Sequence, residues 1–384
     1  MPSLLSSDER GAELHAFANT RSGRGKPGQY WKIDLETLEA GANGSTTVAG
    51  RVEIESASPR VIACNLEIAA RDHGELLARA FRRAIEPQHK FAHLALAHAG
   101  LGAFIYVPAD CAVDEPVTVR YFGQTAFATE DNEPIFPYTV VLAERGARVT
   151  VIERVALSGG GFACGVAEIV TEESADVTYA SAQFAPQDAR VLFTRVARPG
   201  RDARIAWASA ELGASLSVTD LAITIEQPGV DARIATLFFP TGAQHVDIVS
   251  SVDHRTGDAT SETLVKSAAA GRGQGRYLGN IRIAAHAQHS DASLRDDALL
   301  LSPTAHIDSI PALEIAANDV KAYHGATVGA LDDESIFYMT SRGIAREAAE
   351  RMIALGFFEP AIDRFPTESL RDELRAVLQA KVTA

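Results

Sequence analysis

The sequence predicts a mostly β protein whose core is a parallel β-helix, a solenoid, lying between helical segments. The first observation is a repeat of about 28 residues, in which Ala is followed two residues later by Val or Ile, at Ala147, Ala175, Ala203 and Ala232. The second is a period-two alternation of apolar and polar residues inside the units. A fixed period of this length indicates stacked supersecondary units, and the alternation indicates that these units are strands.

The length of the repeat selects the kind of solenoid. Two strands of about five to six residues and two turns fill about 28 residues, which corresponds to one coil of a parallel β-helix. A half-period copy lies at Ala189, and looser copies follow at Ala259, Ala287 and Ala317. A leucine-rich or helical repeat is excluded because neither an asparagine ladder nor a 3.6-residue period is present.

The chain divides into three segments: a mixed and helical segment at 1–95, the β-helix at 96–330 and a helical segment at 331–384. The strand pattern begins near Phe104 and continues to about Gly329. Turns are expected where Gly and Pro cluster between the strands, at Gly159–Gly161, Pro199–Gly200, Pro228–Gly229 and Gly271–Gly273.

Helices are predicted at the N-terminal end of the solenoid. Ser6 and Glu9 form a capping box that opens a short helix. Apolar spacing predicts a second helix over Glu75–Ile85 and a third over Phe91–Ala99. The Gly- and Arg-rich stretch Thr20–Pro27 is expected to form a loop.

Further helices are predicted at the C-terminal end. Asp332 or Asp333 is expected to cap one helix, and Arg346–Leu355 is expected to form another that stops at Gly356. A last helix begins at Thr367, with apolar residues on one face. Such a helical cap suits a β-solenoid, because the open edge of a coil invites the addition of a foreign strand.

Composition limits the partners and the compartment. The net charge of −14 argues against nucleic acid as the main partner, because phosphate binding needs a clustered basic face. No apolar run reaches the roughly 18–20 residues of a membrane span, and the N-terminus has no signal-peptide pattern. Three widely spaced cysteines are expected to be reduced thiols, most of them small buried residues, so a cytoplasmic location is predicted.

The motif search finds no catalytic constellation and no nucleotide fingerprint. The Gly271-x-Gly273-x-Gly275 run resembles a phosphate loop, but a strand pattern follows it where a helix is required. His286 and His289 are expected in a strand, where they would point to opposite sides and remain surface residues. His324 precedes Gly325 and Gly329, which permit close backbone approach or positive φ. Its imidazole is a candidate metal ligand, and a hydrogen-bonded structural role remains open.

The stretch from Leu313 to Phe357 resembles the SufB/SufD family of iron–sulfur cluster assembly proteins, and it is most similar to the SufD branch. The block Asp319–Gly343 is the most specific part, because His-Gly-Ala-Thr and Ser-Arg-Gly occur there at fixed spacing. Weaker similarity extends over about residues 90 to 384. The resemblance implies that the β-helix is right-handed and lies between two helical segments.

The resemblance also implies a role and a set of site residues. It implies a scaffold subunit, not an enzyme, that pairs with a SufB-like subunit and carries a SufC-like ABC-type ATPase near its C-terminal helices. A transient Fe–S cluster would be shared with the partner at their junction, with His324 as the metal ligand of this chain. Tyr338, Arg342 and Gly343 are expected to bind a partner. Many relatives have cysteine where this chain has Ala322, so this chain alone is not expected to hold iron tightly.

Two other interpretations remain. One is a β-helix carbohydrate-active enzyme, for which Asp296–Asp297 and Asp332–Asp333 would supply carboxylates, although both pairs are expected in turns. The other is a self-associating structural β-helix without a cluster role, because a SufD-like chain in isolation could form a homodimer across the same surface.

Overall fold

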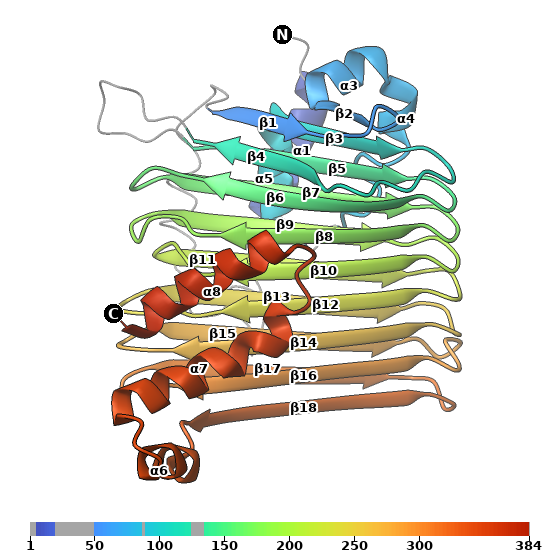
Figure 1. Ribbon diagram of the computed structural model, residues 1–384. Coiled ribbons are helices and arrows are strands. Elements are labelled where there is room, and N and C mark those ends of the chain that lie inside the picture. The colour runs from blue at the N-terminus through green and yellow to red at the C-terminus, as the bar shows by residue number, and fades with distance from the viewer. Residues whose placement is uncertain (1–4, 20–49, 87–88, 124–133, 384) are drawn as a thin grey trace.

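The computed structural model describes residues 5–19, 50–86, 89–123 and 134–383, and it forms a β-solenoid of about seven turns with helices at both ends (Figure 1). The expected loop at Thr20–Pro27 lies outside the described residues. The solenoid confirms the mostly β fold class that the sequence predicts. The division at residues 95 and 330 stays a prediction.

Each coil of the solenoid contributes one strand to each of two sheets. Sheet A contains β1 (Arg51–Glu55), β4 (Val117–Phe122), β6 (Arg148–Ala156), β8 (Asp176–Gln183), β10 (Arg204–Glu211), β12 (Asp231–Phe238), β14 (Thr260–Ala269), β16 (Asp291–Leu300) and β18 (Lys321–Ala330). Sheet B contains β2 (Ile62–Asn65), β3 (Leu101–Val107), β5 (Pro137–Ala143), β7 (Phe162–Thr171), β9 (Arg190–Arg198), β11 (Leu216–Ile225), β13 (His245–His254), β15 (Gln274–Ile283) and β17 (His306–Ile315).

The strands of the coils pair in parallel, and only β1 and β2, at the N-terminal end of the described sheets, pair antiparallel to their neighbours. In Figure 1 the strands of sheet A run to the left in front, and those of sheet B run to the right behind, while the chain descends. The coil is therefore right-handed.

Alternation in the sequence places one set of side chains inside the coil. In sheet A the inward residues include Val149, Val177, Ile205 and Ile234, all almost fully buried. Tyr179 and Trp207 pack against each other inside the coil in a tilted arrangement, with their ring centroids 4.6 Å apart. Each buried side chain of this size stabilises the fold by about 1.5–3 kcal/mol relative to an exposed one.

The repeat seen in the sequence is not a strict structural repeat. Ala147, Ala175 and Ala203 each precede a strand and stack in one column, because Arg148, Asp176 and Arg204 are in register. Ala232 is instead in register with Ile205, two residues further along the strand. A shift of two residues keeps the side chain on the inward face, so the alternation survives a change in coil length.

The turns before the sheet A strands share one conformation. A left-handed residue recurs at one corner of successive coils, including Ser174, Asp202, Asp258 and His289, with φ between 54° and 60°. Small polar residues tolerate this region better than bulky ones. His286 and His289 lie in this turn between β15 and β16, so the expectation that they belong to a strand was wrong.

The interior of the coil also contains charged groups. Glu153, Arg195 and Glu211 are each at most 2% exposed, and Arg195 lies 3.3 Å from Glu211 and 3.7 Å from Glu153. Thr139 and Tyr179 donate hydrogen bonds of 2.7 Å to Glu153. A buried Arg with two carboxylates is costly unless each group is paired, so this cluster depends on its geometry.

The N-terminal helices are α1 (Ser7–Asn19), α3 (Leu66–Asp72), α4 (Gly74–Ala78) and α5 (Lys90–Ala97). The capping box is confirmed, because the Glu9 carboxylate accepts from Ser6 N and the Glu9 amide donates to Ser6 Oγ. The helix expected over Glu75–Ile85 ends instead at Ala78. The carboxylate of Glu168 accepts the amides of Arg82 and Ala84, which draws this backbone out of a helix.

The C-terminal helices are α6 (Asp333–Ser341), α7 (Arg346–Ile362) and α8 (Glu368–Thr383), and α7 and α8 cross the outer face of sheet A (Figure 1). Asp332 caps α6, as predicted. The expected stop at Gly356 was wrong, because α7 continues through it and buries Phe358 and Ile362 against the helical cluster. α8 buries Leu370, Leu374 and Leu378 on one face.

Candidate functional site

The C-terminal end of the solenoid is an open edge. Sheet A ends at β18 and sheet B at β17, and in the described part of the chain no strand pairs with the far edge of either. Ile315, Tyr323 and Val328 are 42%, 61% and 45% exposed on these two strands. We call β17 and β18 together the end strands. Such an edge presents backbone donors, acceptors and apolar side chains to a partner.

His324 lies in the middle of β18 and is exposed. It is in register with Leu294 of β16, which is 1% exposed and belongs to the interior. The register therefore places His324 on the inward face of the last coil, where no further coil follows among the described residues. Ala322, two residues earlier, shares this face, because alternate residues of a strand point to the same side.

The stretch around His324 is the last strand, in keeping with the strand pattern expected up to about Gly329. Neither Gly325 nor Gly329 has positive φ. A Cβ at position 329 would meet no atom within 4 Å, and one at 325 would meet the hydroxyl of Tyr323. Gly325 therefore leaves room for the ring of Tyr323 against the backbone of β18, whereas Gly329 makes no tight contact within the described part of the chain.

Asp296 and Asp297 were expected in a turn, but they lie within β16 and point to opposite faces of sheet A. Asp297 faces outward and accepts hydrogen bonds of 2.8 Å from Lys266, Arg295 and Thr327. Burial by itself raises the pKa of Asp297, but the hydrogen bonds from Lys266 and Thr327 hold this pKa below its usual range. Because the two carboxylates diverge, they do not form the pair that a glycosidase needs.

Asp296 faces inward and is fully buried. Ser309 of β17 donates a hydrogen bond to its Oδ2, whereas Oδ1 has no hydrogen-bond partner among the described residues. Burial raises the pKa of Asp296 to about 7, and the charge of Asp297 acts in the same direction. Sequence reasoning did not connect Asp296 with His324, because 28 residues separate them along the chain.

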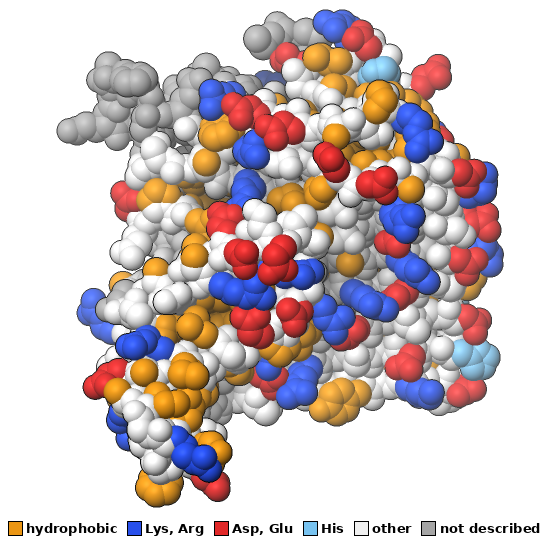
Figure 2. Space-filling model, viewed as in Figure 1, with side chains coloured by type: hydrophobic (Ala, Val, Ile, Leu, Met, Phe, Trp, Pro, Cys, Tyr) orange, Lys and Arg blue, Asp and Glu red, His pale blue; other side chains and the backbone are white. Residues whose placement is uncertain are grey.

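A second exposed surface lies on α6 and α7. Phe337, Tyr338 and Met352 are 72%, 58% and 56% exposed, and the guanidinium of Arg342 lies 5.0 Å from the centre of the Tyr338 ring. Gly343, with φ of 85°, ends α6. We call these five residues the α6 patch. Figure 2 shows hydrophobic side chains gathered over α6, at the lower left. Sequence reasoning singled out Tyr338, Arg342 and Gly343 but not Phe337 and Met352, and partner binding by these residues stays a prediction.

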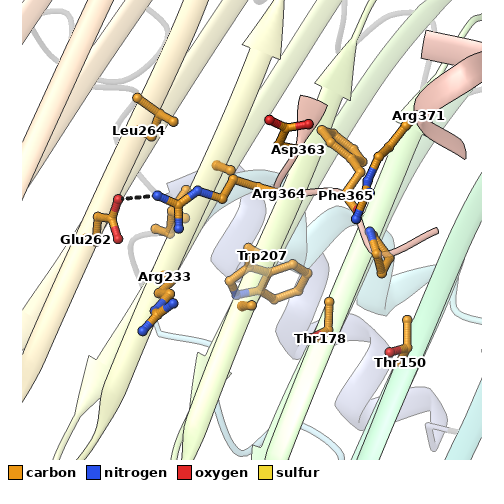
Figure 3. Close-up of a pocket in the computed structure, with 14 residues that line it drawn as sticks. Thr150, Thr178, Trp207, Arg233, Glu262, Leu264, Asp363, Arg364, Phe365 and Arg371 are labelled. Atoms are coloured by element: carbon orange, nitrogen blue, oxygen red, sulfur yellow. Dashed lines mark hydrogen bonds and ion pairs between the residues drawn. The ribbon is translucent and has the colours of Figure 1, made fainter. Parts of the chain in front are cut away.

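A groove of about 430 Å³ lies between sheet A and the junction of α7 and α8 (Figure 3). Its floor is a column of small outward residues on neighbouring strands, Thr150, Thr178 and Ala206. Arg364 at its rim bonds Glu262 at 2.7 Å, and the guanidinium of Arg371 bonds the carbonyl of Phe365 at 2.7 Å. Arg233, which also lines the groove, pairs with Asp231, so each of these three cations already has an acceptor within this chain.

In the part of the chain that the structure describes, no group of three His, Cys, Asp or Glu side chains converges as a metal site. Nor does any described helix combine the length and apolar character needed to cross a bilayer. On the inward face next to the unpaired sheet edge, the structure offers the exposed imidazole of His324 and, one strand away in β16, the buried carboxyl of Asp296.

Comparison with known proteins assigns a family to this arrangement. The family model described as "SUF system FeS cluster assembly, SufBD core domain" matches residues 126–357. The chain is 28% identical to the iron–sulfur cluster assembly protein SufD of Bacillus subtilis, over 84% of this chain and 74% of that protein. It is 29% identical to the chloroplastic protein ABCI7 of Arabidopsis thaliana, over 72% of this chain and 60% of that protein. It is also 28% identical to a SufBD family protein of Mycobacterium leprae, of which it spans 30%.

Proposed function

The chain belongs to the SufBD family of iron–sulfur cluster assembly proteins as a homologue of SufD, and from this premise we propose how it works. It is a scaffold subunit, without an enzymatic reaction of its own, that pairs with a SufB-like subunit through its end strands. A SufC-like ABC-type ATPase binds the α6 patch. The complex works in the cytoplasm and builds a transient Fe–S cluster at the junction of the two β-helices.

The observation that carries this proposal is the open edge with an exposed imidazole on it. β17 and β18 offer two neighbouring strand edges, and Tyr323 and Val328 supply exposed apolar area on the strand that carries His324. A partner that adds its own strands here would satisfy the backbone groups and bring its ligands beside the imidazole.

His324 is the residue of this chain proposed to contact iron. A neutral imidazole donates a nitrogen lone pair to iron, while the thiolates that hold most of the cluster come from the partner. Ala322, on the same face, supplies no thiolate where many relatives have cysteine. The cluster is therefore cargo shared across the junction.

The α6 patch supports the ATPase as the second partner. Exposed aromatic and Met side chains next to an Arg are the residue types that dominate protein interfaces. Phe337 and Tyr338 together leave an apolar surface that α6 does not bury against the solenoid, whereas Ile336 of the same helix is 3% exposed.

A chain of contacts links the C-terminal helices with β18. Phe357 of α7 lies 4.5 Å from the ammonium of Lys266, measured to the ring centre. Lys266 bonds Asp297, and Asp297 bonds Thr327, three residues after His324. A movement of α7 caused by ATP binding to the partner would therefore reach the strand that carries the imidazole, by a shift of population between two arrangements.

Co-purification tests the pairing. The wild-type chain, Val328→Lys and Phe337→Asp are each co-expressed with a SufB-like subunit and a SufC-like ATPase. We expect Val328→Lys to lose the SufB-like subunit and keep the ATPase, because a lysine on an edge strand opposes strand addition. Phe337→Asp should show the reverse. If both variants retained both partners, the two surfaces would be assigned wrongly.

His324→Ala tests the ligand role. The substitution lies on an exposed side chain, so folding and ATPase binding should be unchanged. Cluster maturation should fall several-fold, measured as iron and acid-labile sulfide in the co-expressed complex and as growth in a complementation assay. Undiminished complementation would show that His324 is not part of the cluster site. It would not affect the proposed subunit pairing, which the co-purification experiment tests separately.

A further inference from the structure

The inside of the last complete coil holds a carboxyl group without a counter-charge. Asp296 is fully buried, and the group that bonds it is the neutral hydroxyl of Ser309. The charged group that acts most on it is another carboxylate, Asp297, on the opposite face of the strand. A carboxylate in such a place needs a proton or a cation, because an unpaired buried charge costs several kcal/mol.

The lack of a counter-charge is specific to Asp296, as the neighbouring carboxylate of Asp297 shows. Asp297 has two cationic partners, Lys266 and Arg295, each at 2.8 Å. The other carboxylates inside the coil, Glu153 and Glu211, share Arg195. Asp296 is thus the inward carboxyl near the open end, and its Oδ1 has no hydrogen-bond partner among the described residues.

The register brings this carboxyl close to His324. Asp296 is in register with Ala326 of β18, and His324 is two residues before Ala326 on the same inward face. One strand spacing and two residues of rise separate the two Cα atoms by about 8 Å. Ala326 places only a methyl group at the register position beside the carboxyl, and no further strand among the described residues follows β18.

We propose that Asp296 is a second metal-binding residue of this subunit, which together with His324 holds a divalent iron ion at the open end of the coil. This inference rests on the proposed function of the end strands and extends it. Imidazole nitrogen and carboxylate oxygen are a ligand pair that suits Fe²⁺, and the sites left open on the ion are available to sulfide and to thiolates of the partner. The chain would then deliver iron, while its partner delivers sulfur ligands.

Ser309 is the positioning residue in this arrangement. Its hydroxyl comes from sheet B and holds Oδ2 across the interior, which leaves Oδ1 directed away from that bond and without another partner among the described residues. Asp296 lies near Tyr277, and the hydroxyl groups of Tyr277 and Ser250 are hydrogen-bonded to each other at 2.5 Å. The neutral neighbours therefore orient the carboxyl without neutralising it, which keeps it available to a cation.

The test is anaerobic titration of the isolated full chain with Fe²⁺, followed by equilibrium dialysis, and with Co²⁺ as an optical reporter of coordination. Asp296→Asn keeps the shape of the side chain and removes the charge. We expect it to weaken Fe²⁺ binding at least tenfold, as His324→Ala should. The double variant should be no weaker than the worse single variant, because both residues bind one ion. Ser309→Ala should weaken binding less than either.

Asp291→Asn is the matched control, because Asp291 lies exposed at the start of the same strand. It should bind Fe²⁺ like the wild type, and all variants should keep their thermal midpoints within a few degrees. Wild-type affinity in Asp296→Asn, or the absence of Fe²⁺ binding by the wild-type chain, would overturn the inference. The outcome of the co-purification test does not depend on either result. Failure of the metal site can therefore be distinguished from failure of the subunit pairing.

Discussion

At the residue scale, the buried charges inside the coil are the most demanding feature of this solenoid. Glu153, Arg195 and Glu211 come from β6, β9 and β10, and Ser209 and Ser217 add hydrogen bonds of 3.0 and 2.9 Å to Glu211. Because sequence positions 153, 195 and 211 share an interior only after the chain has completed its coils, the cluster ties strands of both sheets to one register. We therefore interpret this buried cluster of charges as a structural feature of the coil.

We predict that Arg195→Met destabilises the protein strongly. Removing the guanidinium leaves two carboxylates buried without a cation, which costs about 3–5 kcal/mol. Chemical denaturation followed by circular dichroism measures the loss. Arg204→Met is the control, because Arg204 lies exposed on the outer face of β10, and it should change the free energy of unfolding by less than about 0.5 kcal/mol. Equal effects of the two substitutions would contradict the assignment.

Asp296 predicts a pH dependence of stability in the metal-free protein. Its pKa is raised to about 7 in the folded state, from an ordinary value of 3.8, chiefly by burial. The folded state therefore holds the proton more tightly than the unfolded state. The contribution of Asp296 protonation to the free energy of unfolding is fully present below about pH 4, and it is lost as the pH rises to about 7.

The free energy of unfolding of Asp296→Asn, minus that of the wild type, should therefore grow between pH 4 and 7 and then level off. The ceiling is about 4 kcal/mol. Denaturation with a chelator present, at four or five pH values, provides the measurement. Other titrating groups, such as the buried His254, are common to both proteins and cancel in the difference. A difference that stays flat across this range would refute the prediction.

At the scale of elements, α7 and α8 are more than a cover for sheet A. Arg154 of β6 bonds Glu373 of α8 at 2.9 Å, and Lys381 near the end of α8 donates to the carbonyl of Leu212 at 2.9 Å. The contact of α7 with Lys266 differs from these, because it continues through Asp297 to the last strand. The helices are thereby joined to the end strands by polar contacts.

We predict that Lys266→Met uncouples α7 from β18. The isolated variant should exchange the amide hydrogens of β18 about tenfold faster, because the bond from Thr327 to Asp297 loses its cationic support. In the complex, ATPase binding should persist while cluster formed per ATP hydrolysed falls several-fold.

Arg364→Met is the control for this link, because the Arg364–Glu262 pair also joins the helical layer to sheet A but does not contact β18. It should leave exchange in β18 unchanged. If the two variants gave the same exchange in β18, the link through Asp297 would not operate.

At the scale of the whole molecule, the two ends of the solenoid differ. At the N-terminal end, β1 and β2 fold back antiparallel onto the sheets, α3 contacts β2, and α4 and α5 contact strands of sheet B. At the C-terminal end, the helices lie on the side of sheet A and leave the end strands open (Figure 1). Joining through the end strands alone favours a complex of two chains over a filament, because each chain then offers one edge for strand addition.

We predict that the isolated chain forms a concentration-dependent dimer through the end strands. Light scattering after size exclusion should give twice the monomer mass at high concentration. Val328→Lys should shift the chain to monomer without lowering its thermal midpoint, because Val328 is exposed. Dimers of Val328→Lys that are as stable as those of the wild type would place the interface elsewhere.

Much of the architecture follows from local patterns that a sequence displays directly. The period of about 28 residues gave the coil, and the Ser6–Glu9 pair and Asp332 gave two helix starts, because alternation and capping depend on near neighbours. The helix expected over Glu75–Ile85 was cut short by Glu168, a residue from a distant strand. The stop expected at Gly356 failed because packing of Phe358 and Ile362 outweighs the low helix propensity of one glycine.

By itself, the sequence determined that this protein is a coil of paired strands with helical ends, and it singled out His324 as the residue to examine. Only the tertiary structure decided that His324 lies on an open inward face, that Asp296 and Asp297 diverge, and that one of them lies one strand from the imidazole. The physical reason is that strand periodicity is a property of adjacent residues. The register between coils, and with it each contact between distant residues, is set by turn length and packing along the whole chain.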